Sequence, residues 1–582
     1  MLRSSLLLFI TISVLSFVPA SCAGQEQDTG NSCKCLYGDS CWPTEADFAE
    51  LSSRLSQPLI RPVPPASACY PAESPSPGCV EAQANTFNGT WRADQPGAYQ
   101  YPNFEAYILP NGTVSACYLN ATLGFSCEQG SVPSLGVDAR DVGDVQAAVR
   151  FVAEKNLRLV VKNTGHDNLG RSSARNGFMI WTHHMKNITY NESFVPEGAL
   201  ETETYQAITL GAGVQLSEAY SAAQHVNRLI VGGLDASVGV AGGWVGGGGH
   251  GAYAPQYGLG VDNAIQFTVV TAHGDHVTAN AYSHPDLFWA LRGGGPGTYG
   301  VVTSVTFKTH PVEPLVVGVV TANFTSIDIA KSVGTEFYKL QPSLSDAQWG
   351  GYSSYSPAGF FYLFYAPNVT MEQINTTIGP FLEQLKATAG EDNTQVSMSP
   401  APSFYDVFEQ TSSQADRHVG INLELGSRLY TRNLYETVPE KMAETFLQIP
   451  SSLGVATAHV AGGAVSQIDP ESVGLNPAWR DTLGLVFIGA EWENGASAEE
   501  IRVKQDVLKQ AVSVMEELEP GRGSYVNEGS LYEPNPQWTY FGDHYDRLLE
   551  IKDQYDPNGL FVVASGVGSE RWDDGLNCRV DQ

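Results

Sequence analysis

Basic residues are scarce in this sequence. Its 582 residues include 32 Lys and Arg against 62 Asp and Glu, which gives a formal net charge of −30 at pH 7. A protein that binds nucleic acid needs a basic surface to neutralise phosphates, and this composition does not supply one. We therefore exclude a nucleic acid as partner. Hydrophobic residues make up 42% of the chain, so large cores are expected, and the length predicts two or more domains.

Long hydrophobic runs are also missing. No stretch reaches the roughly 20 apolar residues that a membrane-spanning helix requires. The one apolar run, Leu6–Val18, is shorter; it follows Met1-Leu2-Arg3 and precedes the small residues Ser21-Cys22-Ala23. This order is typical of a signal peptide, with a buried first helix as the alternative. We assign residues 1–23 to a signal peptide and expect a protein that is secreted or held in the lumen of the secretory or vacuolar system, without a membrane partner.

Cysteine is sparse and unevenly placed. Once Cys22 leaves with the signal peptide, eight cysteines remain, seven of them before residue 128 and the last at Cys578. In an exported protein these are expected to form disulfides that stabilise the region 24–129, which is rich in Pro, Ser and Asn. The spacing does not determine the pairing. No histidine precedes His166, so a Cys/His zinc knuckle is not supported, and we predict no metal site.

Asn-x-Ser/Thr sequons agree with export, because N-glycans are attached in the secretory pathway. A single sequon is common by chance, so their number carries the argument. We expect N-glycans at several of Asn88, Asn111, Asn120, Asn187, Asn191, Asn323, Asn368 and Asn375.

Short strands alternate with helices from about residue 130, which predicts an α/β or α+β fold. Asp141 is placed to cap a helix whose apolar residues, from Val145 to Val152, recur with the helical period. In the tail, we predict a helix that stops at Asp556-Pro557 and then a short apolar strand. Strands are predicted at 157–161, 178–181, 207–211, 264–271, 276–280, 360–364 and 483–488, with a further helix around 216–223.

Glycine is concentrated in three runs, at 239–251, 258–260 and 293–300. Glycine lets a backbone approach a ligand closely and point its N–H groups at phosphate oxygens. Gly246-x-Gly248-x-x-Gly251 matches the dinucleotide-binding pattern, but Pro255 follows in place of a helix, so we reject that interpretation. Tight turns alone are the alternative. Three runs in one region favour a large phosphate-bearing cofactor.

A histidine stands at the mouth of a predicted strand, in "VKNTGHDNLGRSS", residues 161–173. A surface position or a hydrogen-bonding role is the ordinary explanation for such a residue. If the loop faces the same cofactor as the glycine runs, His166 lies beside that cofactor. His183 and His184 are adjacent and cannot form a metal-binding pair one helical turn apart, and no Gly-x-Ser-x-Gly elbow supports a hydrolase.

The motif Lys162-x-x-Gly165-His166, the glycine run at 231–263 and the tail "YDPNGLF" resemble the berberine-bridge-enzyme-like flavoproteins of the vanillyl-alcohol oxidase superfamily. The segment "CKCLYGDSCWPTEADFAELSSRLSQPLIRPVPPASACY" is similar to the fungal isoamyl alcohol oxidase-like branch of that family. The resemblance extends from about residue 33 to 565. Several unrelated stretches agree in order, which makes it specific.

This resemblance implies an α+β fold. A two-part FAD-binding domain of the PCMH type would comprise 130–312 and 516–582, and a substrate domain at 313–515 would hold an antiparallel sheet backed by helices. The resemblance also implies a covalent bond between His166 and the flavin 8α-methyl group. The other residues expected at the FAD are Asn163, Thr164, Gly165, Asp167, Asn168, Leu169, Gly170, Asp235, Ser237, Val238, Gly239, Gly242, Gly243, Gly248, His250 and Asp262.

One position departs from the family pattern. Many members form a second flavin bond from a cysteine in Cys-Pro-Thr-Val-Gly, and this stretch reads Asp235-Ala236-Ser237-Val238-Gly239 here. Without the thiol we expect a single covalent link, through His166. Val238 matches the position that controls oxygen access in the family, and a small valine there suggests that O2 reaches the flavin. Gly243 stands where many members have histidine.

The activity implied by the resemblance is oxidation of a hydroxyl on a small alcohol or secondary metabolite, by hydride transfer to FAD, with O2 accepting the electrons and giving H2O2. "GSYVNEGS", residues 523–530, resembles the Tyr-x-Asn segment of the family's cleft. Tyr525, Asn527 and Glu528 are therefore the catalytic candidates, although Glu528 fits a packing strand equally well. Tyr352, Tyr362, Tyr430 and Trp492 are candidates for cleft walls or for core.

Two alternatives stay open at this point. A biosynthetic dehydrogenase or oxidative cyclase would use the same flavin with O2 as a poor acceptor. A non-catalytic secreted glycoprotein would keep the fold for binding only.

Overall fold

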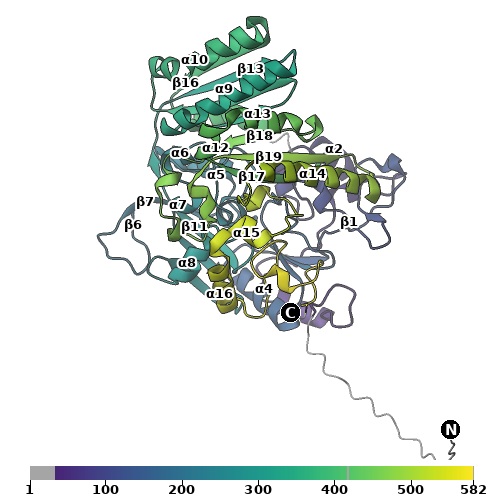
Figure 1. The fold of residues 1–582 in the computed structure, drawn as a ribbon. Helices are drawn as coiled ribbons and strands as arrows, with labels where there is room; N and C mark the ends of the chain where they lie inside the picture. The colour runs from purple at the N-terminus through teal and green to yellow at the C-terminus, as the bar shows by residue number, and fades with distance from the viewer. Residues whose placement is uncertain (1–32, 416–418, 581–582) are drawn as a thin grey trace, which may run out of the picture.

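The structure is a computed structural model that describes residues 33–415 and 419–580. The expected signal peptide, residues 1–23, lies outside these residues. Figure 1 shows a seven-stranded sheet with its helices in the upper part of the molecule, and smaller sheets with the C-terminal helices below. The α+β architecture and its antiparallel sheets are as predicted.

The N-terminal region has little regular structure and is cross-linked by disulfides. Cys35–Cys41, Cys69–Cys79 and Cys117–Cys127 each close a short loop, while Cys33–Cys578 joins positions 545 residues apart. The last bond ties the start of the described chain to its end, which no spacing rule indicates. The elements of this region are α1 (Glu45–Ser52), α2 (Gly78–Ala84), α3 (Gly89–Ala93), β1 (Tyr107–Ile108) and β2 (Val114–Ser115).

A three-stranded parallel sheet follows, in the order β3 (Leu135–Asp138), β5 (Phe178–Trp181), β4 (Leu159–Lys162). Helix α4 (Val142–Lys155) begins where predicted, because the Asp141 side chain accepts a hydrogen bond from the Asp144 backbone N–H. Its apolar residues pack into the same core as β3 and β5. Strand β4 begins two residues later than predicted and ends directly before the loop that carries His166.

A five-stranded antiparallel sheet forms the second half of this part, in the order β10-β9-β11-β7-β6. The predicted hairpin is present between β9 and β10, and Gly274 has the positive φ of +77° that its turn requires. The strands are β6 (Ile188–Phe194), β7 (Tyr205–Gly211), β9 (Ala264–Val270), β10 (His276–Asn280) and β11 (Val301–Lys308), with the short pair β8 (Arg228–Leu229) and β12 (His310–Pro311). The helices are α5 (Leu216–His225), α6 (Ala254–Tyr257), α7 (Gly260–Asn263) and α8 (Pro285–Leu291).

The large sheet is antiparallel throughout and has the order β16-β13-β15-β14-β18-β19-β17. Residues of α9, α10, α13 and α14 pack on one face of it in a single hydrophobic core. Its strands are β13 (Leu315–Asn323), β14 (Gly350–Tyr355), β15 (Gly359–Pro367), β16 (Thr394–Ala401), β17 (Asn422–Thr431), β18 (Ala456–His459) and β19 (Thr482–Trp492). Its helices are α9 (Ile327–Asp346), α10 (Met371–Ala389), α11 (Phe404–Ala415), α12 (Arg432–Thr437), α13 (Pro439–Gln448) and α14 (Ala498–Leu518). The domain boundaries at 312 and 515 stay a prediction.

The C-terminal segment returns to the lower part, where α16 (Tyr545–Tyr555) contacts both α8 and the preceding helix α15 (Pro536–Phe541) (Figure 1). The prediction of a strand after Pro557 is wrong. The backbone N–H groups of Leu560 and Phe561 donate to the buried Asp556 carboxylate at 2.7 and 2.8 Å, so they are not available to a sheet. Lys552 donates to the same carboxylate at 2.5 Å and to the carbonyls of Thr298 and Phe561.

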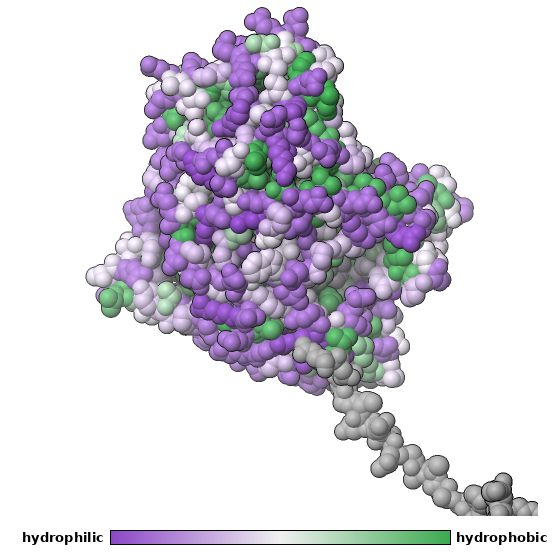
Figure 2. All heavy atoms as spheres, viewed as in Figure 1, coloured by the Kyte–Doolittle hydropathy of each residue, from purple (hydrophilic) through white to green (hydrophobic). Residues whose placement is uncertain are grey.

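Hydrophilic residues cover most of the face shown in Figure 2. All eight sequon asparagines are exposed, so the geometry allows glycans at each of them. Within the described residues, no helix is both long enough and apolar enough to span a membrane.

Replacing Asp556 with Ala is expected to destabilise the fold by about 3–5 kcal/mol, because it leaves the buried Lys552 ammonium without its counter-charge. Asp553→Ala, on the same helix, removes a half-exposed carboxylate paired with Arg571 and should cost about 1 kcal/mol or less. Chemical unfolding of the two variants measures the difference. Equal midpoints would contradict the structural role given to Asp556.

Candidate functional site

The loop that follows β4 is held rigidly by its own backbone and by the next strand. The Asn163 side chain donates to the Ala212 carbonyl at 2.7 Å, and the Trp181 indole donates to the Asn163 carbonyl at 3.0 Å. Gly165 has a φ of +81°, and a Cβ there would lie 3.1 Å from the Tyr99 Cα. Glycine is therefore required immediately before His166, both for the conformation and for the close approach.

The N-terminal region braces the other side of this loop. The backbone N–H of Gln100 donates to the Gly165 carbonyl at 3.1 Å, and the Gln100 side chain donates to the Thr164 carbonyl at 3.0 Å. Gln100 is completely buried. The disulfide-linked region is therefore part of the site, a role that its composition did not indicate.

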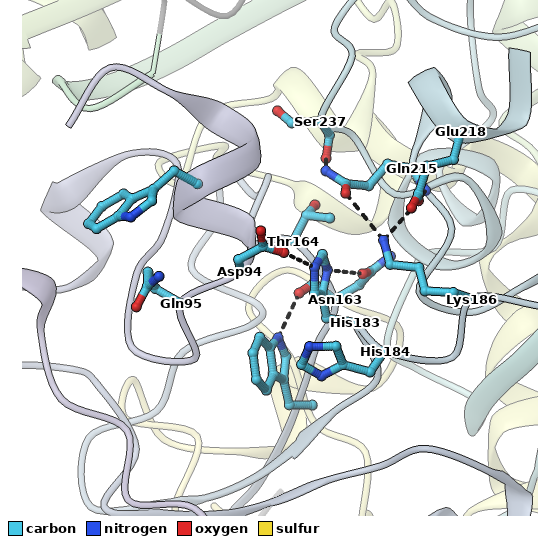
Figure 3. Close-up of polar contacts among 12 residues, drawn as sticks. Asp94, Gln95, Asn163, Thr164, His183, His184, Lys186, Gln215, Glu218 and Ser237 are labelled. Atoms are coloured by element: carbon cyan, nitrogen blue, oxygen red, sulfur yellow. Dashed lines mark hydrogen bonds and ion pairs between the residues drawn. The ribbon is translucent and has the colours of Figure 1, made fainter. Parts of the chain in front are cut away.

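A polar network supports the loop from behind, as Figure 3 shows. His183 lies between the Asp94 carboxylate, 2.6 Å from its Nε2, and the Asn163 side-chain oxygen, 3.4 Å from its Nδ1. Burial, together with the Lys186 charge, lowers the pKa of His183 to about 4, so its ring is neutral at pH 7. Lys186 donates in turn to Gln215 at 3.2 Å and to Glu218 at 2.8 Å.

A cavity opens between this loop and two of the glycine runs. A Cβ atom at Gly242 or Gly243 would have no other atom within 4 Å, so the cavity beside these two glycines is open because they carry no side chains. Nine of the predicted residues line the cavity: Asn163, Thr164, Gly165, His166, Asp167, Val238, Gly239, Gly242 and Gly243. The run 295–300 lines it as well.

Three buried polar atoms on the cavity wall have no hydrogen-bond partner among the described residues: Arg171 Nη1, Ser172 Oγ and Thr298 Oγ1. Buried polar groups are normally satisfied, so these atoms indicate a polar ligand. Arg171 is also the only Lys or Arg among the described lining residues. A large cofactor that carries phosphate fits this combination of cation, hydroxyls and bare backbone.

His166 lines the cavity, and its Nε2 has polar contacts within the protein. Its Nε2 lies 2.7 Å from the Ser237 hydroxyl and 3.5 Å from an Asp235 carboxylate oxygen. Burial lowers the pKa of His166, and the Asp235 charge partly opposes this shift. The imidazole is therefore neutral at pH 7, with a lone pair on one nitrogen.

The other predicted cofactor residues lie outside the cavity wall. Leu169 is part of the core, a Cβ at Gly170 would meet the Phe104 ring, and the Asn168 side chain donates to the Asn527 carbonyl at 2.9 Å. Asp262 forms a buried ion pair with Arg480 at 2.8 Å and accepts from the Leu259 backbone. Their cofactor roles stay predictions, as do those of Gly248 and His250.

The three catalytic candidates lie in a short 3₁₀ helix, Val526–Glu528, and at its start, not in a strand. Tyr525 is buried, and its oxygen accepts from the Asn527 side chain at 2.8 Å. Asn527 also accepts from Arg171 at 2.8 Å, which joins this segment to the His166 loop across 356 residues of sequence.

Glu528 pairs with His250, whose Nε2 lies 3.0 Å from Glu528 Oε1. Glu528 Oε2 is buried and has no partner among the described residues. The Tyr525 ring packs edge-on against His250 at 5.1 Å, and the Tyr352 ring lies 6.3 Å from it. Of the other aromatic candidates, Tyr362 and Tyr430 are core residues between the large sheet and its helices.

Sequence reasoning missed several residues of the cavity wall. Arg171 lies within the predicted loop 161–173, and the need of a phosphate for a cation was a signal that could have identified it. Ser172, Thr298 and Trp244 carry no comparable signal in the sequence, because only the folded backbone turns them toward the cavity.

Comparisons with known proteins agree with this geometry. Residues 133–280 match the FAD binding domain family, and residues 524–568 match the berberine and berberine-like family. An uncharacterized FAD-linked oxidoreductase of Arthroderma benhamiae is 36% identical over 589 residues, covering 97% of this chain and 98% of that protein. The VAO-type flavoprotein oxidase VAO615 of Thermothelomyces thermophilus is 32% identical over 562 residues, covering 93% and 94%.

Solved structures show the same fold. The VAO-type flavoprotein MtVAO615 from Myceliophthora thermophila C1 superimposes with a TM-score of 0.84 at 29% identity, covering 94% of this chain and 100% of that one. Berberine bridge enzyme from Eschscholzia californica superimposes with a TM-score of 0.65 at 18% identity, covering 90% and 98%. Since relatives more than 30% identical match almost its whole length, the chain belongs to the FAD-linked oxidoreductases of the vanillyl-alcohol oxidase and berberine bridge enzyme family.

Proposed function

We propose that this protein is an exported oxidase that oxidises a hydroxyl of a small alcohol or secondary metabolite, with FAD bound covalently to His166 and O2 as electron acceptor. The observation that carries the proposal is the position of His166. Its neutral ring lies on the wall of a glycine-lined cavity, and that cavity is joined through Arg171 and Asn527 to a carboxylate with a free oxygen.

The cavity supplies the groups that an FAD would need. The bare backbone at 242–243 and 295–300 would approach its phosphates, and Arg171, Ser172 and Thr298 would donate to its oxygens. When bound, FAD supplies the ring that accepts hydride. His166 would hold it through one bond only, because Asp235 stands where a thiol would be needed for a second bond. A covalent bond keeps the cofactor from being lost outside the cell.

Glu528 is the group best placed to take the proton of the substrate hydroxyl. Its Oε1 is occupied by His250, which fixes the carboxylate, while Oε2 has no partner in the part of the chain that the structure describes. A base must reach the hydroxyl within hydrogen-bonding distance, and an oriented carboxylate oxygen meets that requirement.

Tyr525 is better suited to orient the substrate than to act as the base. Burial, followed by the Glu528 charge, raises the pKa of Tyr525, which disfavours the phenolate. Its oxygen accepts from the Asn527 side chain, so its own proton can be donated to a substrate oxygen.

Two further features support the oxidase assignment and export. The small Val238 lines the cavity, so no bulky side chain at this position blocks the path of O2. Four disulfides and eight exposed sequons suit an oxidising, glycosylating compartment.

The acceptor can be tested with a panel of alcohols, sugars and polyketide-like hydroxyl compounds. We expect at least one of them to give H2O2 under air at a rate close to that with an artificial electron acceptor. Turnover with the artificial acceptor but without H2O2 would contradict the use of O2 and favour a dehydrogenase or cyclase.

His166→Ala is expected to release its flavin on acid precipitation, because the only covalent bond is removed. The wild type should keep the yellow colour in the pellet, as should His225→Ala, which changes an exposed histidine at the end of α5. Absorbance of pellet and supernatant measures the outcome. Flavin retained in the His166→Ala pellet would show that another residue forms the bond.

Glu528→Gln keeps the shape of the side chain but removes the base, so anaerobic flavin reduction by substrate should slow by about 10²-fold or more. Tyr525→Phe removes one hydrogen bond and should slow the same step by about tenfold. Stopped-flow reduction, with a melting curve to confirm the fold, separates the two roles. A larger loss in Tyr525→Phe than in Glu528→Gln would transfer the role of base to Tyr525.

A further inference from the structure

We propose that Asp235 and Ser237 form a positioning dyad that fixes the tautomer of His166, so that FAD is attached through Nδ1. The inference rests on the proposed attachment through His166 and assigns a role to the residues that stand in place of the second, cysteine-based link.

The dyad is defined by short contacts. The Ser237 hydroxyl lies 2.7 Å from His166 Nε2 and 2.9 Å from Asp235 Oδ1, and the Ser237 backbone N–H donates to the same oxygen at 2.9 Å. Asp235 Oδ1 is itself 3.5 Å from His166 Nε2. Ser237 has no exposed surface, so water does not compete for its hydroxyl.

The positions of the protons along the hydrogen bonds from Asp235 through Ser237 to His166 follow from the chemistry of these groups. An ionised carboxylate only accepts hydrogen bonds, so the single Ser237 hydroxyl hydrogen must point to Asp235. The Ser237 oxygen then accepts from His166, which requires the His166 proton to be on Nε2. The lone pair is consequently on Nδ1, the nitrogen that takes no part in these contacts. A carboxylate that binds one nitrogen of an imidazole, directly or through another group, commonly fixes the tautomer in which the second nitrogen is free to form a bond.

The backbone around the dyad is fixed by the start of α5. The Leu216 N–H donates to the Val238 carbonyl at 2.9 Å, and the Ser217 N–H donates to the Ala236 carbonyl at 3.1 Å. The Gln215 side chain donates to the Ser237 carbonyl at 3.1 Å and accepts from Lys186, as Figure 3 shows. Groups held in this way by a helix start keep their orientation without the ligand.

The covalent attachment of FAD to His166 needs no reactant other than O2. A bond forms between His166 Nδ1 and the 8α carbon, and one C–H bond of the methyl group breaks. The two electrons of the C–H bond remain on the isoalloxazine ring, which becomes reduced, and O2 reoxidises it to give H2O2. The methyl proton is released to the reduced ring or to solvent. The Nε2 proton leaves by way of Ser237 toward Asp235, which offsets the positive charge that develops on the imidazole.

The test compares four variants with the wild type: Ser237→Ala, Ser237→Thr, Asp235→Asn and, as a control for the loss of one carboxylate, Asp346→Asn at an exposed ion pair with Arg432. Total bound flavin is measured before acid treatment and attached flavin after it. The isolated flavin peptide is examined by NMR, which correlates the 8α methylene protons with the ring carbons and identifies the bonded nitrogen.

We expect an Nδ1 bond in the wild type, in Asp346→Asn and in Ser237→Thr, which keeps the hydroxyl. Ser237→Ala and Asp235→Asn should bind FAD but attach at least tenfold less of it in a fixed time, or give a mixture of Nδ1 and Nε2 bonds. Asn in place of Asp235 can donate to Ser237 and reverse the chain of hydrogen bonds, which places the His166 proton on Nδ1.

The inference is overturned if the wild type is bonded through Nε2, a result that needs no variant to fold. It is also overturned if Ser237→Ala and Asp235→Asn attach FAD as fast as the wild type and through Nδ1. Flavin that is attached elsewhere than at His166, or not attached at all in the wild type, would refute the proposed covalent link itself and is recognised separately from failure of the dyad.

Discussion

The position of the His166 loop is the constraint on which the rest of the site depends. The loop leaves β4 with Gly165 in a left-handed conformation, and parts of the chain distant in sequence fix it there. Gln100 binds its carbonyls from the N-terminal region, Ala212 holds Asn163, and Asn527 meets Arg171 from the C-terminal segment. Because backbone and buried side chains make these contacts, the position of the loop that carries His166 is fixed.

The same contacts explain why the two ends of the chain belong to one functional unit. The Cys33–Cys578 disulfide joins them covalently, and the Lys552–Asp556 pair packs the tail against the run 295–300 through the Thr298 carbonyl. A loss of either end would therefore change the cavity wall as well as the stability of the fold. The cysteine-linked N-terminal region is a structural support of the loop that carries His166.

Local signals in the sequence were sufficient for elements whose bonds are local. Asp141 and the apolar period after it predicted α4, and the alternation around Gly274 predicted the β9–β10 hairpin. The prediction of a strand in the tail was wrong because the nearby Asp556 carboxylate folds back and accepts from the backbone amides of Leu560 and Phe561, which a strand would use. Nine cavity residues were expected because the His166 loop and the glycine run resemble those of a known family, whereas Ser172 and Thr298 depend on contacts that only the folded chain creates. Asp262, which was expected at the cofactor, forms a buried ion pair with Arg480, and its cofactor role stays a prediction.

Tandem mass spectrometry of a tryptic digest of the wild-type protein tests the central claim most directly. Trypsin cleaves after Lys162 and Arg171, which isolates the peptide Asn163–Arg171 with His166 as its only histidine. The account predicts that this peptide carries the mass of one flavin cofactor on His166 and that peptides containing residues 235–251 carry none. An unmodified Asn163–Arg171 peptide from yellow protein, or flavin on a residue of the glycine run, would contradict it.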